Sequence, residues 1–309
     1  MSSTAIECTG LGKVYRSGFF RIPFVGVRSL DLRVERGETF GFIGPNGAGK
    51  TSTIKCLMGL QSATSGEATI LGVDHRDPES KRKVGFLPER PYFYEHLTAW
   101  EFLDFYGTLF EVPKALRHKR MEELLERVQL SRFRDVPLRT FSKGMLQRAG
   151  VAQALINEPD LVVMDEPMSG LDPMGRALIR DILFEEREKG RTVFFSSHIL
   201  ADVEAICDRV AIIVGGELRG CGTVDELVGH QTQYVDIGFS GACPPELSAH
   251  RLGLVRAQPD QVDATIDRLR TAGCSIVRVT PVRKHLEEVL LDEVDRNARV
   301  DTRRLGVLT

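Results

Sequence analysis

One short segment, Gly44 to Thr51, limits the folds open to this chain more than any other part of the sequence. It reads GPNGAGKT and fits the P-loop pattern in full, between an apolar run that predicts a strand (38–44) and a run with helical spacing (50–60). The glycines let backbone amides wrap phosphate groups, Lys50 reaches the outer phosphates, and the Thr51 hydroxyl can hold Mg²⁺. An ordinary glycine turn would not require Lys-Thr directly after its last glycine. The residues expected to bind phosphate are Gly44, Pro45, Asn46, Gly47, Ala48, Gly49, Lys50, Thr51 and Ser52.

A second segment supplies acidic side chains. The run LVVMDEP, Leu161 to Pro167, is apolar until Asp165 and Glu166, which is typical of a strand buried on both faces. At the end of such a strand, Asp165 can hold the water shell of Mg²⁺ and Glu166 can polarise an attacking water. Taken alone, Asp165 and Glu166 would fit a solvated turn with two acidic residues equally well. With a P-loop upstream, the catalytic interpretation is favoured.

Two further segments have features of ligand sites. His198 ends the strand-like run RTVFFSSH, and strand ends of this kind face the ligand in a P-loop fold. FSKGM, Phe141 to Met145, is predicted to open a helix, with Ser142 as its cap and Gly144 allowing a close backbone approach. Free amides at a helix N-terminus bind anions. The sequence therefore predicts a second anion site, well downstream of the P-loop.

The order of the expected elements predicts an α/β fold with more than one part. Strands and helices alternate as far as about Gly222, which predicts a core with a mostly parallel sheet. From Tyr234 the pattern becomes strand, loop, strand (251–258), helix, strand and helix, enough for a small α+β domain. The domains expected are 1–229, a small α+β domain over 230–295, and a loose tail over 296–309 where apolar periodicity is weak.

Composition bears on the class of partner. The formal net charge is −2, so no overall basic field indicates nucleic acid. No apolar run approaches the roughly 20 residues of a membrane helix, and the first residues lack the layout of a signal peptide. We therefore expect a cytoplasmic protein that can still dock on a membrane partner. The scattered cysteines have no paired metal spacing and are expected to be reduced, small apolar residues.

Taken as a set, these motifs resemble the nucleotide-binding subunit of an ATP-binding cassette (ABC) transporter over about residues 6–227. The P-loop is similar to the Walker A loop of that family, LVVMDE to its Walker B strand, FSKGM to its signature, and SGLD (169–172) to its D-loop. KVYR resembles the adenine-stacking loop, with Tyr15 as the platform. GFLPER resembles the glutamine loop, with Glu89 in the glutamine position, and His198 resembles the switch histidine.

The resemblance implies a P-loop NTPase core with a mostly parallel sheet, an antiparallel β subdomain and a helical subdomain at about 90–157. It implies that the chain binds ATP and Mg²⁺, hydrolyses ATP, and drives a separate transmembrane permease from the cytoplasmic face of the cell membrane. The residues carried over are Glu166 and His198 for catalysis, Tyr15, the P-loop, Ser142 and Gly144 for the nucleotide, and Thr51, Glu89 and Asp165 for the metal.

The same resemblance implies a second copy of the chain as a partner. In this family two cassettes pack head to tail, and each ATP lies between one P-loop and the signature of the other chain. Ser142 and Gly144 should therefore meet the γ-phosphate of an ATP held by the second copy. ATP closes such a dimer, and hydrolysis lets it open.

The chain departs from the family pattern at several positions. Glu89 replaces a glutamine, although a carboxylate can still touch Mg²⁺ or its water. Phe141, Lys143 and Met145 differ from the usual signature. Together with the small C-terminal domain, these variants resemble the ATPases of bacterial type-2 ABC exporters.

Two stretches receive a structural interpretation as well. The aromatic stretch 90–106 is expected to form both subdomain core, through Phe102 and Phe105, and a groove for the permease, through Tyr92, Phe93 and Tyr94. Residues 16–28 are expected to lengthen the loop after Tyr15, and we assign them no role.

Two other functions fit parts of the pattern. A soluble ABC ATPase acting on ribosomes or DNA would share the motifs, but such proteins carry two cassettes or long coiled coils, and this sequence shows neither. A P-loop kinase or GTPase would not need the signature or the D-loop, and no Asn-Lys-x-Asp guanine motif is present. The motor subunit of an exporter is the leading interpretation.

Overall fold

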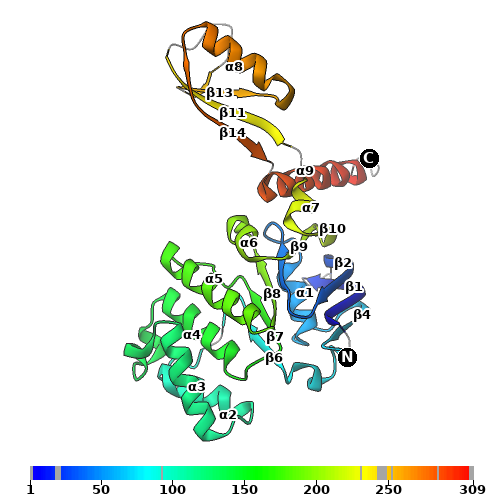
Figure 1. Cartoon of the computed structure of the whole chain (residues 1–309). Helices are drawn as coiled ribbons and strands as arrows, with labels where there is room; N and C mark the ends of the chain where they lie inside the picture. The colour runs from blue at the N-terminus through cyan, green and yellow to red at the C-terminus, as the bar shows by residue number, and fades with distance from the viewer. Residues whose placement is uncertain are drawn as a thin grey trace. The chain divides into compact units, whose positions relative to one another are not determined.

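The computed structural model describes residues 3–17, 22–91, 93–229, 232–241, 249–251, 253–283 and 285–305. The chain divides into two compact units (Figure 1). The first unit comprises Met1–Thr223 with Glu293–Thr309, and the second comprises Val224–Asp292. Every nucleotide motif predicted from the sequence lies in the first unit.

The first unit is built around a six-stranded sheet in the order β10-β9-β3-β8-β7-β6. Its strands are β3 (Thr39–Ile43), β6 (Val84–Leu87), β7 (Leu161–Asp165), β8 (Thr192–Ser197), β9 (Arg209–Val214) and β10 (Glu217–Gly222). β3 pairs in parallel with β8 and β9, and β7 pairs in parallel with β6 and β8. β9 and β10 form an antiparallel hairpin that turns at Gly215 and Gly216. Every residue of β3, β7 and β8 is buried, which confirms the predicted parallel core.

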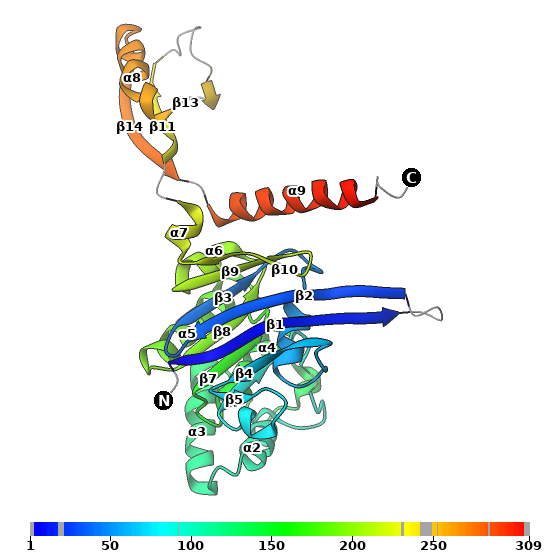
Figure 2. The same ribbon diagram turned by 90° about the vertical axis from the view of Figure 1, so that its right-hand side faces the viewer.

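A second sheet of the first unit is antiparallel, in the order β2-β1-β4-β5. Its strands are β1 (Thr4–Ser17), β2 (Ile22–Glu35), β4 (Ser65–Ile70) and β5 (Val73–Asp74). The lengthened loop predicted over 16–28 is wrong, because residues 22–28 belong to β2, which runs beside β1 in Figure 2. Pro23 is tolerated there because β2 is an edge strand.

Helices surround the central sheet. They are α1 (Lys50–Leu57), α2 (Ala99–Leu109), α3 (Lys114–Arg127), α4 (Lys143–Leu155), α5 (Pro173–Glu188) and α6 (Leu200–Ile206). Helices α2, α3 and α4 gather together beside the β6 and β7 edge of the sheet (Figure 1). Their starts follow local capping chemistry: Thr98 and Glu101 form a capping box, Ser142 caps α4 as predicted, and Asp172 caps α5 ahead of Pro173. Short 3₁₀ turns lie at Pro78–Lys81, Ser131–Phe133 and Leu138–Thr140.

The aromatic stretch after β6 divides between core and surface. Phe102 is 2% exposed and lies in the core, as predicted. Phe105 is 42% exposed, so its assignment to the core was wrong. The buried face of α2 carries Phe102 and Leu103, whereas Phe105 points away and meets the exposed ring of Tyr94, with ring centroids 5.3 Å apart. Tyr92 lies outside the described residues.

The second unit contains the sheet β12-β13-β11-β14, which is antiparallel throughout. Its elements are α7 (Val224–Val228), β11 (Thr232–Ser240), β12 (Ala249–Arg251), β13 (Leu254–Ala257), a 3₁₀ turn (Pro259–Gln261), α8 (Val262–Thr271) and β14 (Ser275–Arg283). Leu269 of α8 packs with Ile237 and Val255 in its core. The single strand predicted over 251–258 is instead two strands, because Gly253, with φ of 72°, turns the chain between them.

The last helix, α9, spans Leu286–Leu305, where the sequence analysis expected a loose tail from residue 296. Weak apolar periodicity suggested the tail, but no glycine or proline occurs between Leu286 and Leu305 to end the helix. Asn297 also accepts a hydrogen bond from Arg219, at 2.6 Å, within the first unit. Residues 306–309 lie outside the described part of the chain.

Candidate nucleotide site

The P-loop borders a cavity of about 400 Å³ in the first unit. The loop follows β3, and α1 begins at Lys50, so the N-terminus of α1 opens onto this cavity. Two glycines are required by close backbone contacts. A Cβ at Gly44 would lie 2.2 Å from the carbonyl oxygen of Ile213, and one at Gly49 would lie 2.4 Å from that of Gly26. The cavity is lined by Phe24, Gly26, Asn46, Gly47, Ala48, Gly49, Lys50, Thr51, Ser52, Glu89, Glu166, Ser169 and His198.

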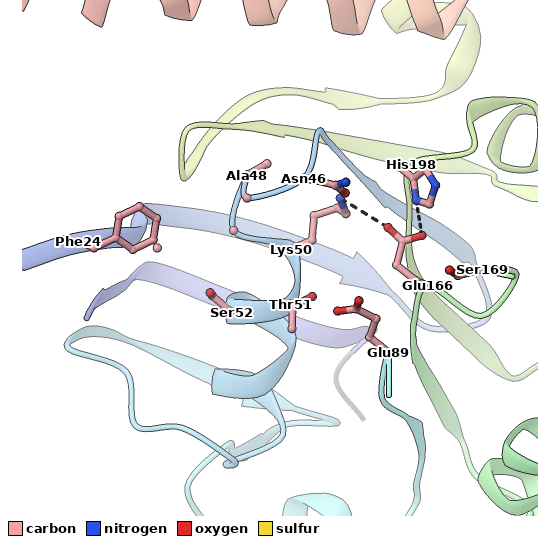
Figure 3. A pocket seen from close by; sticks show the side chains of 13 residues that line it. Phe24, Asn46, Ala48, Lys50, Thr51, Ser52, Glu89, Glu166, Ser169 and His198 are labelled. Carbon is pink, nitrogen blue, oxygen red and sulfur yellow. Dashed lines mark hydrogen bonds and ion pairs between the residues drawn. The ribbon is translucent and has the colours of Figure 1, made fainter. Parts of the chain in front are cut away.

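The carboxylate of Glu166 lies between the side chains of Lys50 and His198 in this cavity (Figure 3). Its Oε2 atom is 2.7 Å from His198 Nδ1, and its Oε1 atom is 3.6 Å from Lys50 Nζ. Lys50 also donates a hydrogen bond to the carbonyl oxygen of Gly44 at 2.7 Å. The side chains of Lys50 and Glu166 are buried, whereas that of His198 is 48% exposed. The structure thus brings together three residues that the sequence placed on three separate motifs.

Asp165 is the last residue of β7 and is buried. Burial raises the pKa of its carboxyl group above the ordinary value, while hydrogen bonds with Ser196 and Thr51 act in the opposite direction and Glu89 adds to the rise. Thr51, Glu89 and Asp165, the three residues predicted to serve Mg²⁺, are therefore neighbours. Among the described residues, no group of three or more His, Cys, Asp or Glu side chains is placed to coordinate a metal ion.

This donor set fits a magnesium ion that arrives with a nucleotide. Mg²⁺ is commonly held by one or two protein oxygens, with phosphate and water oxygens filling its remaining positions. The hydroxyl of Thr51 and the carboxylate of Asp165 are ligands of that kind. The residues present therefore fit the group that the sequence predicts.

Tyr15, the predicted adenine platform, does not line the cavity. Its hydroxyl lies 2.6 Å from Gln61 Oε1 and 2.9 Å from Ser52 Oγ. Phe24 lines the cavity instead, with 59% of its surface exposed. Phe24 is paired with Tyr15 across β1 and β2, and their ring centroids are 6.4 Å apart. Phe24 was not predicted from the sequence, because only the strand register shows that it shares a face with Tyr15.

Two further polar residues were missed, and both contact the turn that carries Glu166. Ser196 of β8 hydrogen-bonds with Asp165 Oδ1 and with the amide of Glu166. Gln147 of α4 donates to the carbonyl oxygen of Pro167 at 3.0 Å. Ser196 lay in the run that ends at His198, and Gln147 lay just after the signature, but their partners are far away in sequence.

The predicted signature residues lie at a different cavity, of about 540 Å³. Ser142 caps α4 by accepting a hydrogen bond from the amide of Met145 at 3.3 Å, and Gly144 lies in the first turn. Lys143 covers Gly170 of the D-loop, since a Cβ at Gly170 would lie 2.7 Å from Lys143 Nζ. Within one chain, the P-loop and the signature therefore border separate cavities.

The fold and the site together define a P-loop nucleotide-binding protein: a parallel sheet, a phosphate loop leading into a helix, and an acidic strand end facing it. The family model described as ABC transporter matches residues 27–169. An uncharacterised ABC transporter ATP-binding protein of Synechocystis sp. is 41% identical over 304 residues, 95% of this chain and 86% of that protein. The chain therefore belongs to the ABC transporter family, as an ATP-binding subunit.

Other relatives and solved structures agree with this assignment. The Nod factor export ATP-binding protein I of Cupriavidus pinatubonensis is 37% identical over 209 residues, 67% of this chain and 64% of that protein. The structure of an ATP-binding subunit of an ABC transporter matches with 32% identity and a TM-score of 0.66, covering 72% of this chain and 91% of that one. A dimeric ATP-binding cassette bound to ADP and Pi shares the fold at 24% identity and a TM-score of 0.66, over 71% of this chain and 98% of that one.

In the described part of the chain, no helix has the length and apolar character needed to cross a membrane.

Proposed function

We propose that this chain hydrolyses ATP and uses the energy to drive a separate transmembrane permease that exports its substrate. One observation carries the proposal: the carboxylate of Glu166 faces the phosphate loop between Lys50 and His198. A carboxylate there can accept a proton from the water that attacks the γ-phosphate. His198 then orients that carboxylate, and Lys50 binds the phosphates.

The proposal assigns the remaining predicted residues to binding. The P-loop amides and the N-terminus of α1 hold the phosphate groups, because they present free N–H donors at the positive end of a helix. Thr51, Asp165 and Glu89 hold Mg²⁺ or its water. When bound, the ion would neutralise charge on the phosphate oxygens.

We further propose that two copies of the chain share each nucleotide. The P-loop and the signature border separate cavities, which supports contact between Ser142, Gly144 and an ATP held by the other copy. In a head-to-tail pair of identical chains, the P-loop cavity of each chain would face the signature cavity of the other. A dimeric solved relative has the same fold.

The permease would dock at a third cavity, of about 570 Å³, which joins the segment 89–96 to the segment 138–147. Tyr94 and His96 are exposed there, and Gln147 forms part of its wall. Export, rather than import, is supported by the similarity to the Nod factor export protein. Docking on a permease would place the chain on the cytoplasmic face of the cell membrane.

The small α+β domain, expected over 230–295, is proposed as an accessory or regulatory module, since every nucleotide motif precedes it. A chain that ends at Gly229 should keep its ATP affinity. Lost affinity in a folded truncated chain would contradict this.

The variant Glu166→Gln tests the proposed function. It keeps the shape of the side chain but removes the proton acceptor, so hydrolysis should fall by about 10²-fold or more while ATP binding persists. Glu158→Gln is a suitable control, because Glu158 is an exposed residue outside the cavity. Turnover of Glu166→Gln at the wild-type rate would exclude Glu166 as the base.

A further inference from the structure

Ser196, near the end of β8, is fully buried beside the acidic end of β7. The parallel pairing of these strands sets Ser196 directly beside Asp165, so both side chains lie on the same face of the sheet. The Ser196 hydroxyl donates a hydrogen bond to Asp165 Oδ1 at 2.6 Å. It also accepts one from the backbone amide of Glu166 at 2.9 Å. One hydroxyl therefore contacts two successive residues of the site.

The contact with Glu166 involves an uncommon backbone conformation. Glu166 has a φ of 54°, in the left-handed region that side chains other than glycine rarely adopt. Its amide is buried, and Ser196 Oγ is its acceptor. A buried amide without an acceptor is unfavourable, so loss of this bond would favour a different conformation of the turn.

The contact with Asp165 involves the direction of its carboxylate. Ser196 has one hydroxyl hydrogen, and that hydrogen points to Asp165 Oδ1, which fixes one oxygen of the carboxylate. Hydrogen bonds to an ionised acceptor are roughly twice as strong as those between neutral groups. Ser196 is not among the residues that line the nucleotide cavity, so it can act only through these neighbours.

We propose that Ser196 is a positioning residue for ATP hydrolysis. Its hydroxyl aims the Asp165 carboxylate towards the Mg²⁺ of the nucleotide, and it holds the Glu166 backbone so that the Glu166 carboxylate faces Lys50 and His198. This inference rests on the roles proposed above for Asp165 and Glu166. It adds a residue whose effect on the metal can be measured without turnover.

The test compares Ser196→Ala with Thr192→Val in the full chain. Thr192 is a buried hydroxyl on the same strand, and it accepts a hydrogen bond from the amide of Gly37 at 3.0 Å, away from Asp165 and Glu166. ATP affinity is measured with a fluorescent ATP analogue, once with Mg²⁺ and once with EDTA. Melting temperature and single-turnover hydrolysis are measured beside it.

For Ser196→Ala we expect unchanged affinity in EDTA, because the P-loop is intact. The gain in affinity on adding Mg²⁺ should fall by about tenfold, the effect of losing one buried hydrogen bond to a charged group. Single-turnover hydrolysis should fall by more, because the backbone amide of Glu166 also loses its hydrogen-bond acceptor. Thr192→Val should lower the melting temperature to a similar extent and keep the full Mg²⁺ gain.

Two further variants separate the possible failures. Ser196→Thr keeps the hydroxyl and should recover most of the Mg²⁺ gain; a well-folded Ser196→Thr that behaves like Ser196→Ala would overturn the inference. Asp165→Asn should abolish the gain, and its failure to do so would remove the proposed role of Asp165 itself. If Asp165→Asn loses the gain while Ser196→Ala matches Thr192→Val, the role of Asp165 stands and that of Ser196 does not.

Discussion

Gln147 donates a hydrogen bond to the carbonyl oxygen of Pro167 at 3.0 Å, so the helix that Ser142 caps is tied to the turn that carries Glu166. Gln147 is 5% exposed, and its amide also lies 3.4 Å from the carbonyl oxygen of Glu166. The same side chain forms part of the wall of the proposed permease groove. We therefore expect that a movement of α4 on docking would shift the turn that carries Glu166 through the hydrogen bond of Gln147.

Replacing Gln147 by alanine should slow hydrolysis by about tenfold and leave ATP affinity within about twofold of the wild type. The reason is that the carbonyl oxygen of Pro167 loses its donor, at roughly 1–3 kcal/mol, whereas that of Glu166 still accepts from the amide of Ser169 and the P-loop is untouched. Steady-state turnover and equilibrium ATP binding give the two values. Gln153→Ala, further along the same helix and half-buried, is the control. Equal losses in both variants would show that only helix packing is involved.

Phe24, rather than Tyr15, should carry the larger share of adenine binding. An exposed ring at the cavity can stack on a base, and such stacking contributes about 1–3 kcal/mol. Phe24→Ala should weaken ATP binding by about tenfold or more, and Phe24→Tyr should restore it. Tyr15→Phe keeps the ring but loses its contacts with Gln61 and Ser52, and should have a smaller effect. Titration of each variant with ATP gives its affinity. A larger loss of affinity in Tyr15→Phe than in Phe24→Ala would identify Tyr15 as the adenine platform instead.

Sharing of each nucleotide between two chains can be tested with defined heterodimers. Pair a Lys50→Ala chain with a Ser142→Arg chain. If each site joins the P-loop of one chain to the signature of the other, both lesions fall in one site and the second site is intact. A doubly substituted chain paired with wild type would instead have one lesion in each site.

The first heterodimer should therefore trap more ATP than the second. Trapped nucleotide per heterodimer is the measurement, because turnover can require both sites. Sites formed within one chain would give the reverse order, since the second heterodimer keeps one wild-type chain. Equal or reversed trapping contradicts the role of Ser142 and Gly144 in contacting the partner's ATP.

Glu186 of α5 should make an unusually large contribution to stability. It is fully buried, and it pairs with Arg127 of α3 at 2.7 Å, with Lys189 at 3.0 Å and with Arg191. Glu186→Gln would leave these cations without a buried counter-charge, at about 3–5 kcal/mol, which urea unfolding can measure. Glu185→Gln is the control, because Glu185 also pairs with Arg127 but is half exposed. A loss no larger than that of the control would refute this.

The ion pairs of Glu186 also predict that the stability of the protein depends on pH. Burial raises the pKa of Glu186, but the hydrogen bond from Arg127 and the charge of Arg191 outweigh it, so the pKa is lowered on balance. A carboxyl group whose pKa is lower in the folded state stabilises the protein at higher pH, and the contribution is lost as the pH falls through the lowered value. The difference in unfolding free energy between wild type and Glu186→Gln should therefore be full near neutrality and shrink below about pH 4. A constant difference down to pH 3 would contradict this.

Local signals in the sequence were enough to predict much of the fold and part of the site. The P-loop, the acidic strand end and the helix cap at Ser142 each depend on residues a few positions apart. They could be predicted because the chemistry of a glycine loop or of a cap is complete within one turn of chain.

What could not be predicted depends on which strands lie side by side. Phe24 reaches the cavity because it pairs with Tyr15 across β1 and β2, and Ser196 reaches Asp165 because β8 pairs with β7 in one particular register. Nothing in the local sequence around Phe24 indicated an edge strand. Without the pairing, serine and phenylalanine are ordinary strand residues.

The left-handed backbone of Glu166 has a consequence for how this protein would respond to laboratory selection. Glycine, and to a lesser degree asparagine, would adopt a φ of 54° with less strain, by about 1 kcal/mol, but neither carries a carboxylate. Glycine at position 166 would also leave the buried Lys50 ammonium without the carboxylate that lies 3.6 Å from it, and that loss outweighs the strain relieved. The strained turn is therefore locked in place by the charge it carries, and a library screened for heat resistance should not drift to glycine at this position.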